Sequence, residues 1–324
     1  MGKFLLRRFV NYLILVILAA SMTYILAGEA LNPRAQFQAK TPPPPKASVD
    51  ASLKTINANP DTPILVRYKR WVGGLLHGDF GKEINGGSVG ADMKRRILVS
   101  TRLLLIATVL GSGLGILIGA YSAIKQYKFS DRVITLTSFV LLSLPLIPLA
   151  IGLKLLAVKV NGWVGHRVLE YTGEYAPDSH GWGRFTSRLQ HLILPTLTLV
   201  LGQVAFYSRY QRATMLDVMG NDFLRTAQAK GLRRRKALMK HGLRTAVLPL
   251  VVLIVYNVSL LFTGAIFTET IFAWHGMGEW SVNSIQQSDV NVVAAIGIFT
   301  SCLILIAGML SDIVYVSLDP RVRV

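Results

Sequence analysis

The sequence is poor in charged residues. Only 16% of its 324 residues are Asp, Glu, Lys or Arg, whereas 52% are hydrophobic and the mean hydropathy is +0.45. Ordinary globular domains carry about 25% charged residues, so this chain has too few to cover a large water-exposed surface. The composition therefore excludes an intrinsically disordered protein and a typical soluble enzyme.

Cysteine is almost absent, and several catalytic motifs are missing. Cys302 is the single cysteine, which excludes an intrachain disulfide and disfavours a cysteine-based metal cluster. His166, Asp178 and His180 share one loop, but their spacing fits no standard metal site. The sequence has no His-Glu-x-x-His and no Gly-x-Ser-Gly, which disfavours a membrane-embedded protease. We therefore predict no catalytic residue and no metal site.

Long apolar runs are what the sequence does have. The first is 9–27, and five more follow at 103–124, 133–158, 192–207, 248–272 and 290–316. A helix needs about 20 apolar residues to cross a bilayer, so these runs predict an all-α membrane protein with six spanning helices. The first run could instead be a cleavable signal peptide, but it is longer than the usual apolar part of one. Pro145 and Pro148 predict a kink inside the third helix.

The segment 29–100 differs from the rest of the chain. A run of four prolines, 42–45, lies among polar residues and predicts a stiff polyproline stretch. Two short amphipathic segments, 71–76 and 93–99, are predicted to be helices at the membrane interface. In the second spanning helix, glycines recur every four residues at 111, 115 and 119, so another helix is expected to approach that face closely.

Positive charge is distributed unevenly among the connections. Lys and Arg together number 35 against 17 Asp and Glu, an excess of 18 that would also suit a nucleic-acid binder. No nucleic-acid partner is predicted, because such a domain would not carry six membrane-length runs. The connection 209–247 holds ten Lys and Arg, and 273–289 holds none. By the positive-inside rule, both termini and the 209–247 loop are cytoplasmic, and 29–100 lies outside.

The same loop carries the most informative pattern. Asn221 is a suitable N-cap for a short helix, Asp222 favours its positive end, and Gly231 is a natural stop. A second amphipathic helix is predicted over 233–245. The loop is therefore expected to form a compact helix–turn–helix against the membrane. Without further information, binding of lipid headgroups would be an equally good interpretation of its positive charge.

Motifs along the whole chain resemble those of a known family. The run Arg225-Thr226-Ala227-Gln228-Ala229-Lys230-Gly231 looks like the EAA loop of ABC-importer permeases, in the form used by the peptide/nickel branch. Further matching motifs are Phe4-Leu5-Leu6-Arg7-Arg8, Gly78-Asp79-Phe80-Gly81, His191-Leu192-Ile193-Leu194-Pro195, Glu269-Thr270-Ile271-Phe272-Ala273-Trp274-His275-Gly276-Met277-Gly278 and Leu318-Asp319-Pro320-Arg321. The set resembles the first, B-type, permease subunit of dipeptide and oligopeptide importers. Gln228 and His275 depart from the residues usual there.

The resemblance implies a fold, a function and partners. The fold is that of a type I ABC-importer permease in the bacterial inner membrane, divided as 1–28 (first helix), 29–100 (extracytoplasmic segment) and 101–324 (five-helix core). The function is uptake of di- or oligopeptides, with nickel or another small solute as the alternative. The implied partners are a second homologous permease, two ATP-binding subunits or one fused double ATPase, an extracytoplasmic solute-binding protein and membrane lipid.

The chain itself is not expected to hydrolyse ATP. Gly81-Lys82 lacks the other residues of a phosphate-binding loop, so no cofactor is predicted for this chain, and ATP and Mg are expected on the partner subunits. A self-contained channel is disfavoured by the docking loop. The residues expected to dock the ATPase are Asp222, Phe223, Arg225, Thr226, Ala227, Ala229, Lys230 and Gly231.

Four polar residues lie within or near the predicted spanning helices. Gln203 and Asn257 are in mid-helix, where they would bond across helices or face the translocation path. Glu269 and Asp312 are ionisable, and such groups at membrane depth are candidates for function. Both also lie close enough to helix ends to be ordinary interfacial residues. All four are candidates for the path or for contacts between helices.

Overall fold

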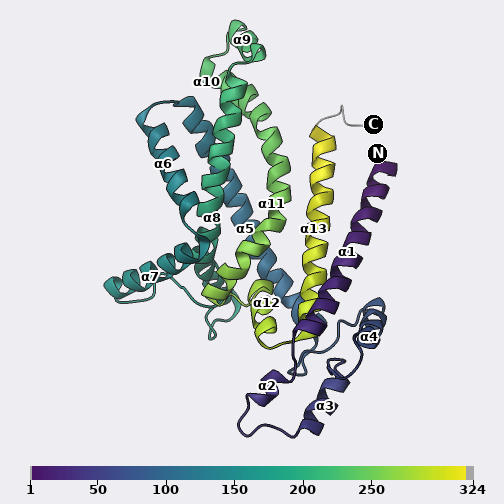
Figure 1. Ribbon diagram of the computed structural model, residues 1–324. Coiled ribbons are helices and arrows are strands. Elements are labelled where there is room, and N and C mark those ends of the chain that lie inside the picture. The colour runs from purple at the N-terminus through teal and green to yellow at the C-terminus, as the bar shows by residue number, and fades with distance from the viewer. Residues whose placement is uncertain (1, 319–324) are drawn as a thin grey trace. The chain divides into compact units, whose positions relative to one another are not determined.

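The structure is a computed structural model that describes residues 2–318, without the side chains of 2–5, 258–261, 263–264 and 315–318. The described chain is helical, and its only β-type pairing is an isolated bridge between Lys82 and Ser88 (Figure 1). The elements in order are α1 (Gly2–Ala30), α2 (Ala35–Gln38), α3 (Lys46–Thr55), α4 (Ile64–Leu76), α5 (Val89–Ile124), α6 (Phe129–Ser143), α7 (Leu146–Val164), α8 (Gly181–Met219), α9 (Asp222–Ala229), α10 (Arg234–Ala237), the π-helical turn η1 (Leu238–Gly242), α11 (Leu243–Phe272), α12 (Met277–Gln286) and α13 (Val290–Leu318).

The predicted number of spanning helices is confirmed. Six helices of the described chain are long and apolar enough to cross a membrane, at Leu6–Gln38, Val89–Ile124, Leu146–Val164, Gly181–Met219, Arg234–Asn257 and Val290–Val314. The chain divides into two compact units. Unit 1 comprises Met1–Thr101 and His275–Met309, and unit 2 comprises Arg102–Trp274 and Leu310–Val324.

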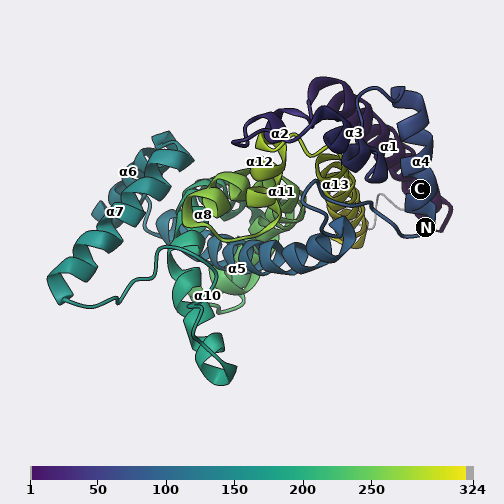
Figure 2. The ribbon, with the colours of Figure 1, turned by 90° about the horizontal axis from the view of Figure 1, so that it is seen from below.

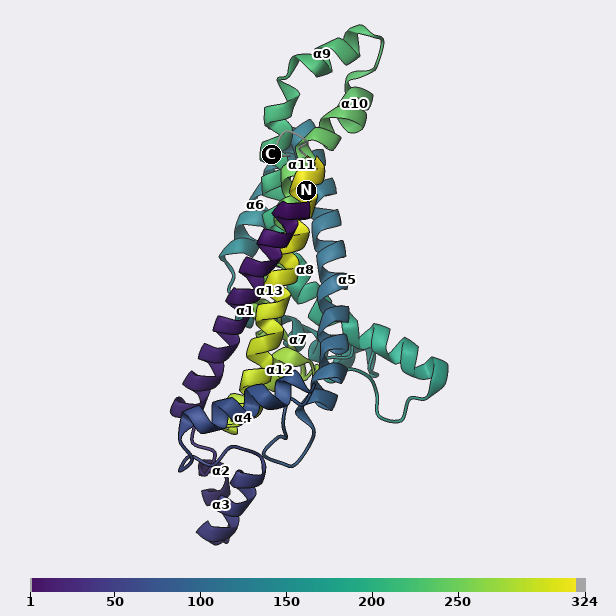
Figure 3. The ribbon, with the colours of Figure 1, turned by 90° about the vertical axis from the view of Figure 1, so that its right-hand side faces the viewer.

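In unit 1, α1 and α13 lie side by side (Figures 1 and 3). Glycines on α13 allow this approach: a Cβ added at Gly297 would lie 2.6 Å from Thr23 Cγ2. In the buried cluster that α1 shares with α13 and α4, Tyr24 stacks on Trp71 of α4 with ring centroids 4.5 Å apart. Such a pair adds about 1 kcal/mol beyond the buried area alone. The predicted short helix at 71–76 thus exists, but it begins earlier, at Ile64, and packs against α1.

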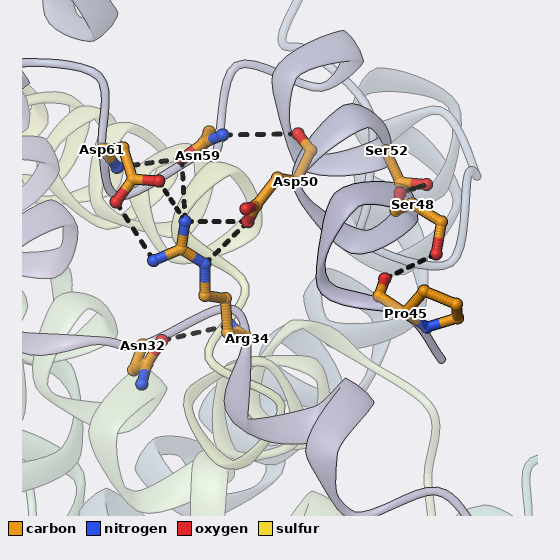
Figure 4. A network of polar contacts seen from close by, with 8 residues as sticks. All are labelled: Asn32, Arg34, Pro45, Ser48, Asp50, Ser52, Asn59 and Asp61. Atoms are coloured by element: carbon orange, nitrogen blue, oxygen red, sulfur yellow. Dashed lines mark hydrogen bonds and ion pairs between the residues drawn. The ribbon is translucent and has the colours of Figure 1, made fainter. Parts of the chain in front are cut away.

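The segment between α1 and α5 has its own small core and a polar network. Val49, Leu53 and Ala58 form a buried apolar cluster. The Arg34 guanidinium lies between two carboxylates, with its Nε donating to Asp50 Oδ1 at 2.8 Å and Nη1 to Asp61 Oδ1 at 3.1 Å (Figure 4). This pairing lowers the pKa of Asp61. The Pro-rich stretch connects α2 to α3 through turns and bends, and Pro45 caps α3.

The prediction of a separate interfacial helix at 93–99 was wrong. These residues belong to the first turns of α5, a single helix of 36 residues. Charged side chains here find partners within unit 1, since Arg96 lies 5.3 Å from the Trp280 ring centre and donates to the His275 carbonyl at 3.2 Å. Because Arg96 has these partners, the helix can continue past the apolar run instead of stopping at the interface.

The prediction of one kinked third helix was also wrong. The chain forms two helices, α6 and α7, separated at Leu144 and Pro145. Leu144 is extended, with φ −80° and ψ 120°, because the residue before proline disfavours the helical conformation. Pro145 then caps α7, and Pro148 falls in the first turn, where amides have no partner inside the helix. Two prolines therefore break the run and start a new helix.

In unit 2, α8 and α11 lie side by side at the centre (Figure 2). The expected close approach to the glycine stripe of α5 is confirmed, and α8 is the helix that makes it. A Cβ added at Gly111 would lie 2.7 Å from the Gln203 Cβ, and one at Gly115 would lie 2.6 Å from the Tyr207 Cβ. Small residues at these positions let the two backbones pack closely.

Candidate coupling loop and membrane polar residues

The loop after α8 forms a hairpin at one end of unit 2 (Figures 1 and 3). Asn221 occupies the N-cap position of α9 with an extended backbone, although its side chain makes no capping hydrogen bond. Gly231 ends the α9 turn with φ +89°, and its N–H donates to the Gln228 carbonyl at 2.9 Å. The predicted helix and its glycine stop are therefore confirmed.

The predicted second helix over 233–245 differs in the structure. It is not an independent element, because α10 passes through η1 directly into α11. The π turn adds one residue to the helical path and places Leu238 and Gly242 in the core. The return arm of the hairpin is thus continuous with a spanning helix. A displacement of the return arm would therefore reach that helix directly.

One side of α9 is anchored. Leu224 is 1% exposed and belongs to a buried cluster with residues of α5, α8 and α10, and Ala227 packs against it. Ala227 is therefore not on the free face expected for docking. The other predicted docking residues are exposed: Asp222, Phe223, Arg225, Thr226, Ala229, Lys230 and Gly231. The Phe223 side chain is 41% exposed, an unusual place for an aromatic ring in a charged loop.

The four candidate polar residues of the spanning helices lie in different surroundings. Gln203 is 8% exposed under Gly111, and its two amide atoms have no hydrogen-bond partner among the described residues. Asn257 Nδ2 donates to Tyr207 Oη at 3.3 Å, so it bonds across helices. Glu269 is fully buried, three residues before the end of α11. Asp312 is half-buried on α13. The structure does not bring the four together.

A polar ladder along α8 was missed from the sequence. Gln203, Tyr207 and Gln211 recur every four residues, and all three are buried against α5. The spacing itself is the signal that would have found them, because residues four apart share a helix face. Gln211 is fully buried, and its amide atoms also have no hydrogen-bond partner in the described chain.

A buried ion pair was missed as well. Asp131, at the start of α6, is 3% exposed and accepts from Arg212 of α8 through Nε at 2.7 Å and Nη2 at 2.9 Å. Ser122 Oγ and the Tyr127 N–H also donate to it, at 2.5 and 2.8 Å. Hydrogen bonding from Arg212 is the main reason that the pKa of Asp131 lies well below its usual range. The pair ties the α5–α6 turn to the helix that leads into α9.

The loop with His166, Asp178 and His180 shows ordinary backbone contacts. His180 Nδ1 lies 3.0 Å from the Asp178 carbonyl oxygen. Within the described residues, no group of three or more His, Cys, Asp or Glu side chains is arranged to hold a metal ion.

Comparison with known proteins identifies the family. The model of the binding-protein-dependent transport system inner membrane component matches residues 115–324, which include the end of α5, the later spanning helices and the hairpin of α9 and α10. The chain belongs to this family. It is thus a multi-pass membrane protein of a transport system, and the resemblance found in the sequence is confirmed. The motif 318–321 falls inside the match, but residues 319–321 lie outside the described part of the structure.

Individual relatives extend the match over the whole chain. The oligopeptide transport system permease protein OppB of Mycobacterium tuberculosis is 51% identical over 326 residues, covering 100% of both chains. AppB of Bacillus subtilis, another oligopeptide transport system permease protein, is 35% identical and covers 81% of each chain. The dipeptide transport system permease protein DppB of Escherichia coli is 31% identical, covering 81% of this chain and 82% of its own length.

Proposed function

We propose that this chain is a membrane-spanning permease subunit of an ATP-driven importer for di- or oligopeptides. The observation that carries the proposal is the 51% identity to an oligopeptide permease across the entire chain, including 29–100 and the α9 hairpin. The relatives reported above are named for oligopeptide and dipeptide transport, which favours peptides over nickel as the solute.

ATP hydrolysis is assigned to partner subunits. The sequence has no phosphate-binding loop of its own, so ATP and Mg would bind to two ATPase subunits or one fused double ATPase. A second homologous permease would complete the translocation path, and a binding protein outside the membrane would deliver the solute. No cofactor is assigned to this chain.

The α9 hairpin is the proposed coupling element. Its inner face is fixed by Leu224, and its outer face presents Phe223 between charged side chains. A helix held in this way moves as a rigid body with the helices behind it. Motion of an ATPase cleft around α9 would pass into α8 and α11 and produce alternating access. This role places the hairpin in the cytoplasm, as the distribution of Lys and Arg favours.

Reconstituted uptake tests the proposed function. The chain is assembled with its partner permease, ATPases and binding protein in vesicles, and ATP-dependent uptake of labelled peptides of two to five residues is compared with uptake of nickel ions. Peptide uptake that needs ATP is expected, with little nickel uptake. Nickel uptake without peptide uptake would overturn the peptide assignment while leaving the permease assignment intact.

A further inference from the structure

A cavity of about 560 Å³ lies at the base of the α9 hairpin, inside unit 2. Its walls come from the last two turns of α5, the end of α8, and α10 with η1. The lining residues are Leu117, Ala120, Tyr121, Ile124, Lys125, Met219, Arg234, Arg235, Leu238 and Met239. One part of the wall is therefore apolar, and the other carries three cations.

Among the described residues, nothing neutralises the three cations. No described acidic side chain lines the cavity. In the described part of the chain, Lys125, Arg234 and Arg235 have neither an ion pair nor a side-chain hydrogen bond. By contrast, Arg212 of the same unit is paired with Asp131. A cluster of like charges beside an apolar wall is complementary to a ligand that has both an anionic group and an apolar part.

The depth of the cavity identifies that anion. Three helices that are candidate spans have an end at the cavity, at Ile124, Met219 and Arg234. The apolar run of α5, 103–124, also ends there, which places the cavity at the level expected for the headgroup layer beside α5. Leu117 and Tyr121 are 58% and 48% exposed, as expected for side chains that face lipid tails. A soluble anion would leave this apolar wall uncovered.

From this arrangement we infer that the cavity binds an anionic phospholipid of the adjacent leaflet. The phosphate lies among Lys125, Arg234 and Arg235, and the first part of an acyl chain lies along Leu117 and Met239. The volume falls in the range of about 300–1,000 Å³ typical of small-molecule sites, which suits a headgroup and a few methylene groups. The inference requires only that the helices cross a membrane, and it does not depend on which solute is carried.

The cavity lies beside the residues that anchor the α9 hairpin, so a bound lipid would affect coupling. Leu238 lines the cavity and also belongs to the buried cluster that anchors Leu224 of α9. Met219 likewise contacts both. A bound lipid therefore supports the base of the coupling hairpin, and the ATPase activity of the assembled importer should depend on anionic lipid.

Native mass spectrometry of the permease pair tests the inference. The complex is purified in micelles that contain equal amounts of phosphatidylglycerol and phosphatidylcholine of different mass. Each Lys or Arg near a membrane surface favours an anionic lipid by about fivefold. Arg234→Gln with Arg235→Gln should therefore lower retained phosphatidylglycerol by about 30-fold. Met239→Trp, which fills the apolar wall without changing charge, should lower it as well.

The matched control removes the same charge elsewhere. Arg233→Gln with Lys236→Gln changes two exposed cations that do not line the cavity, and it should leave lipid retention within twofold of the unmodified chain. Equal loss in both double variants would overturn the inference, because the binding would then be unspecific. Displacement of the lipid by soluble glycerol phosphate would also overturn the inference, because the site would then bind a soluble anion. Release of the lipid when ATPase subunits bind would overturn it too, because the cavity would then be the site of a protein partner.

Discussion

At the scale of single residues, Asp131 is buried and yet charged. It accepts four hydrogen bonds, two of them from the Arg212 guanidinium. A buried carboxylate is stable only when its lone pairs are satisfied, and here they are. The pair joins the turn after α5 to α8, the helix that leads into the α9 hairpin.

Asp131→Asn should destabilise the permease pair by about 2 kcal/mol, because hydrogen bonds to charged groups contribute about 1.5–3 kcal/mol. The melting temperature of the purified complex measures this loss. The folded-state pKa of Asp131 is lowered, so its contribution is fully present above its unfolded pKa of about 4. The difference between the two proteins should accordingly stay constant from pH 8 to pH 6 and shrink only as the pH falls below about 4.

Asp222→Asn is the matched control for that measurement. Asp222 also lies beside an arginine, Arg225, at 3.6 Å, but its side chain is 92% exposed. An exposed pair of this kind contributes at most about 1 kcal/mol. If both variants lower the melting temperature equally, burial is not what gives the Asp131 pair its importance.

At the scale of elements, hydropathy predicts where helices lie better than where they break. The six apolar runs located the spanning helices, because burial in lipid requires continuous apolar stretches. The break at Leu144 arises because the residue before a proline disfavours the helical conformation. A membrane helix can also keep such a proline as a kink when its neighbours satisfy the freed backbone groups, so the sequence alone did not decide between a kink and a break. The continuation of α5 through 93–99 depends on contacts of Arg96 with the Trp280 ring and with a backbone carbonyl far along the chain. No local sequence pattern predicts such contacts.

In the α9 hairpin, too, the features that depend on local sequence were predictable and those that depend on tertiary packing were not. Its glycine stop was predictable, because few other residues adopt φ near +89° without strain. The inward position of Ala227 was not, because it depends on packing against the cluster around Leu224. A large residue at Ala227 would therefore disturb the hairpin itself, and it is a poor probe of docking.

Phe223 and Gly231 are better probes of docking. Phe223→Ala removes an exposed ring and should leave assembly with the second permease intact, while uptake and ATPase co-purification fall at least tenfold. Gly231→Asp forces a non-glycine residue into the left-handed region, at a cost of about 1 kcal/mol or more, and should have the same effect. Arg233→Ala, one exposed cation beyond the turn, serves as the control. Normal uptake in both Phe223→Ala and Gly231→Asp would show that α9 is not the coupling element.

At the scale of the whole molecule, the distribution of charge predicts the orientation in the membrane. The 35 Lys and Arg are not spread evenly: ten lie in 209–247, and none lie in 273–289. Cytoplasmic connections of membrane proteins retain Lys and Arg. We therefore expect the hairpin and its basic cavity on the cytoplasmic side, and 29–100 outside.

Single cysteines in a Cys302→Ser background test this orientation with a thiol reagent that cannot cross the membrane. Ser48→Cys and Asp178→Cys are at exposed positions and should be labelled from outside in intact cells, whereas Gln228→Cys, also exposed, should be labelled only after the cells are opened. Ser187→Cys is unsuitable, because Ser187 is buried and its Oγ accepts from the Ala176 N–H at 2.9 Å. Labelling of Gln228→Cys in intact cells, with the other two silent, would reverse the topology and move the coupling hairpin away from any cytoplasmic ATPase.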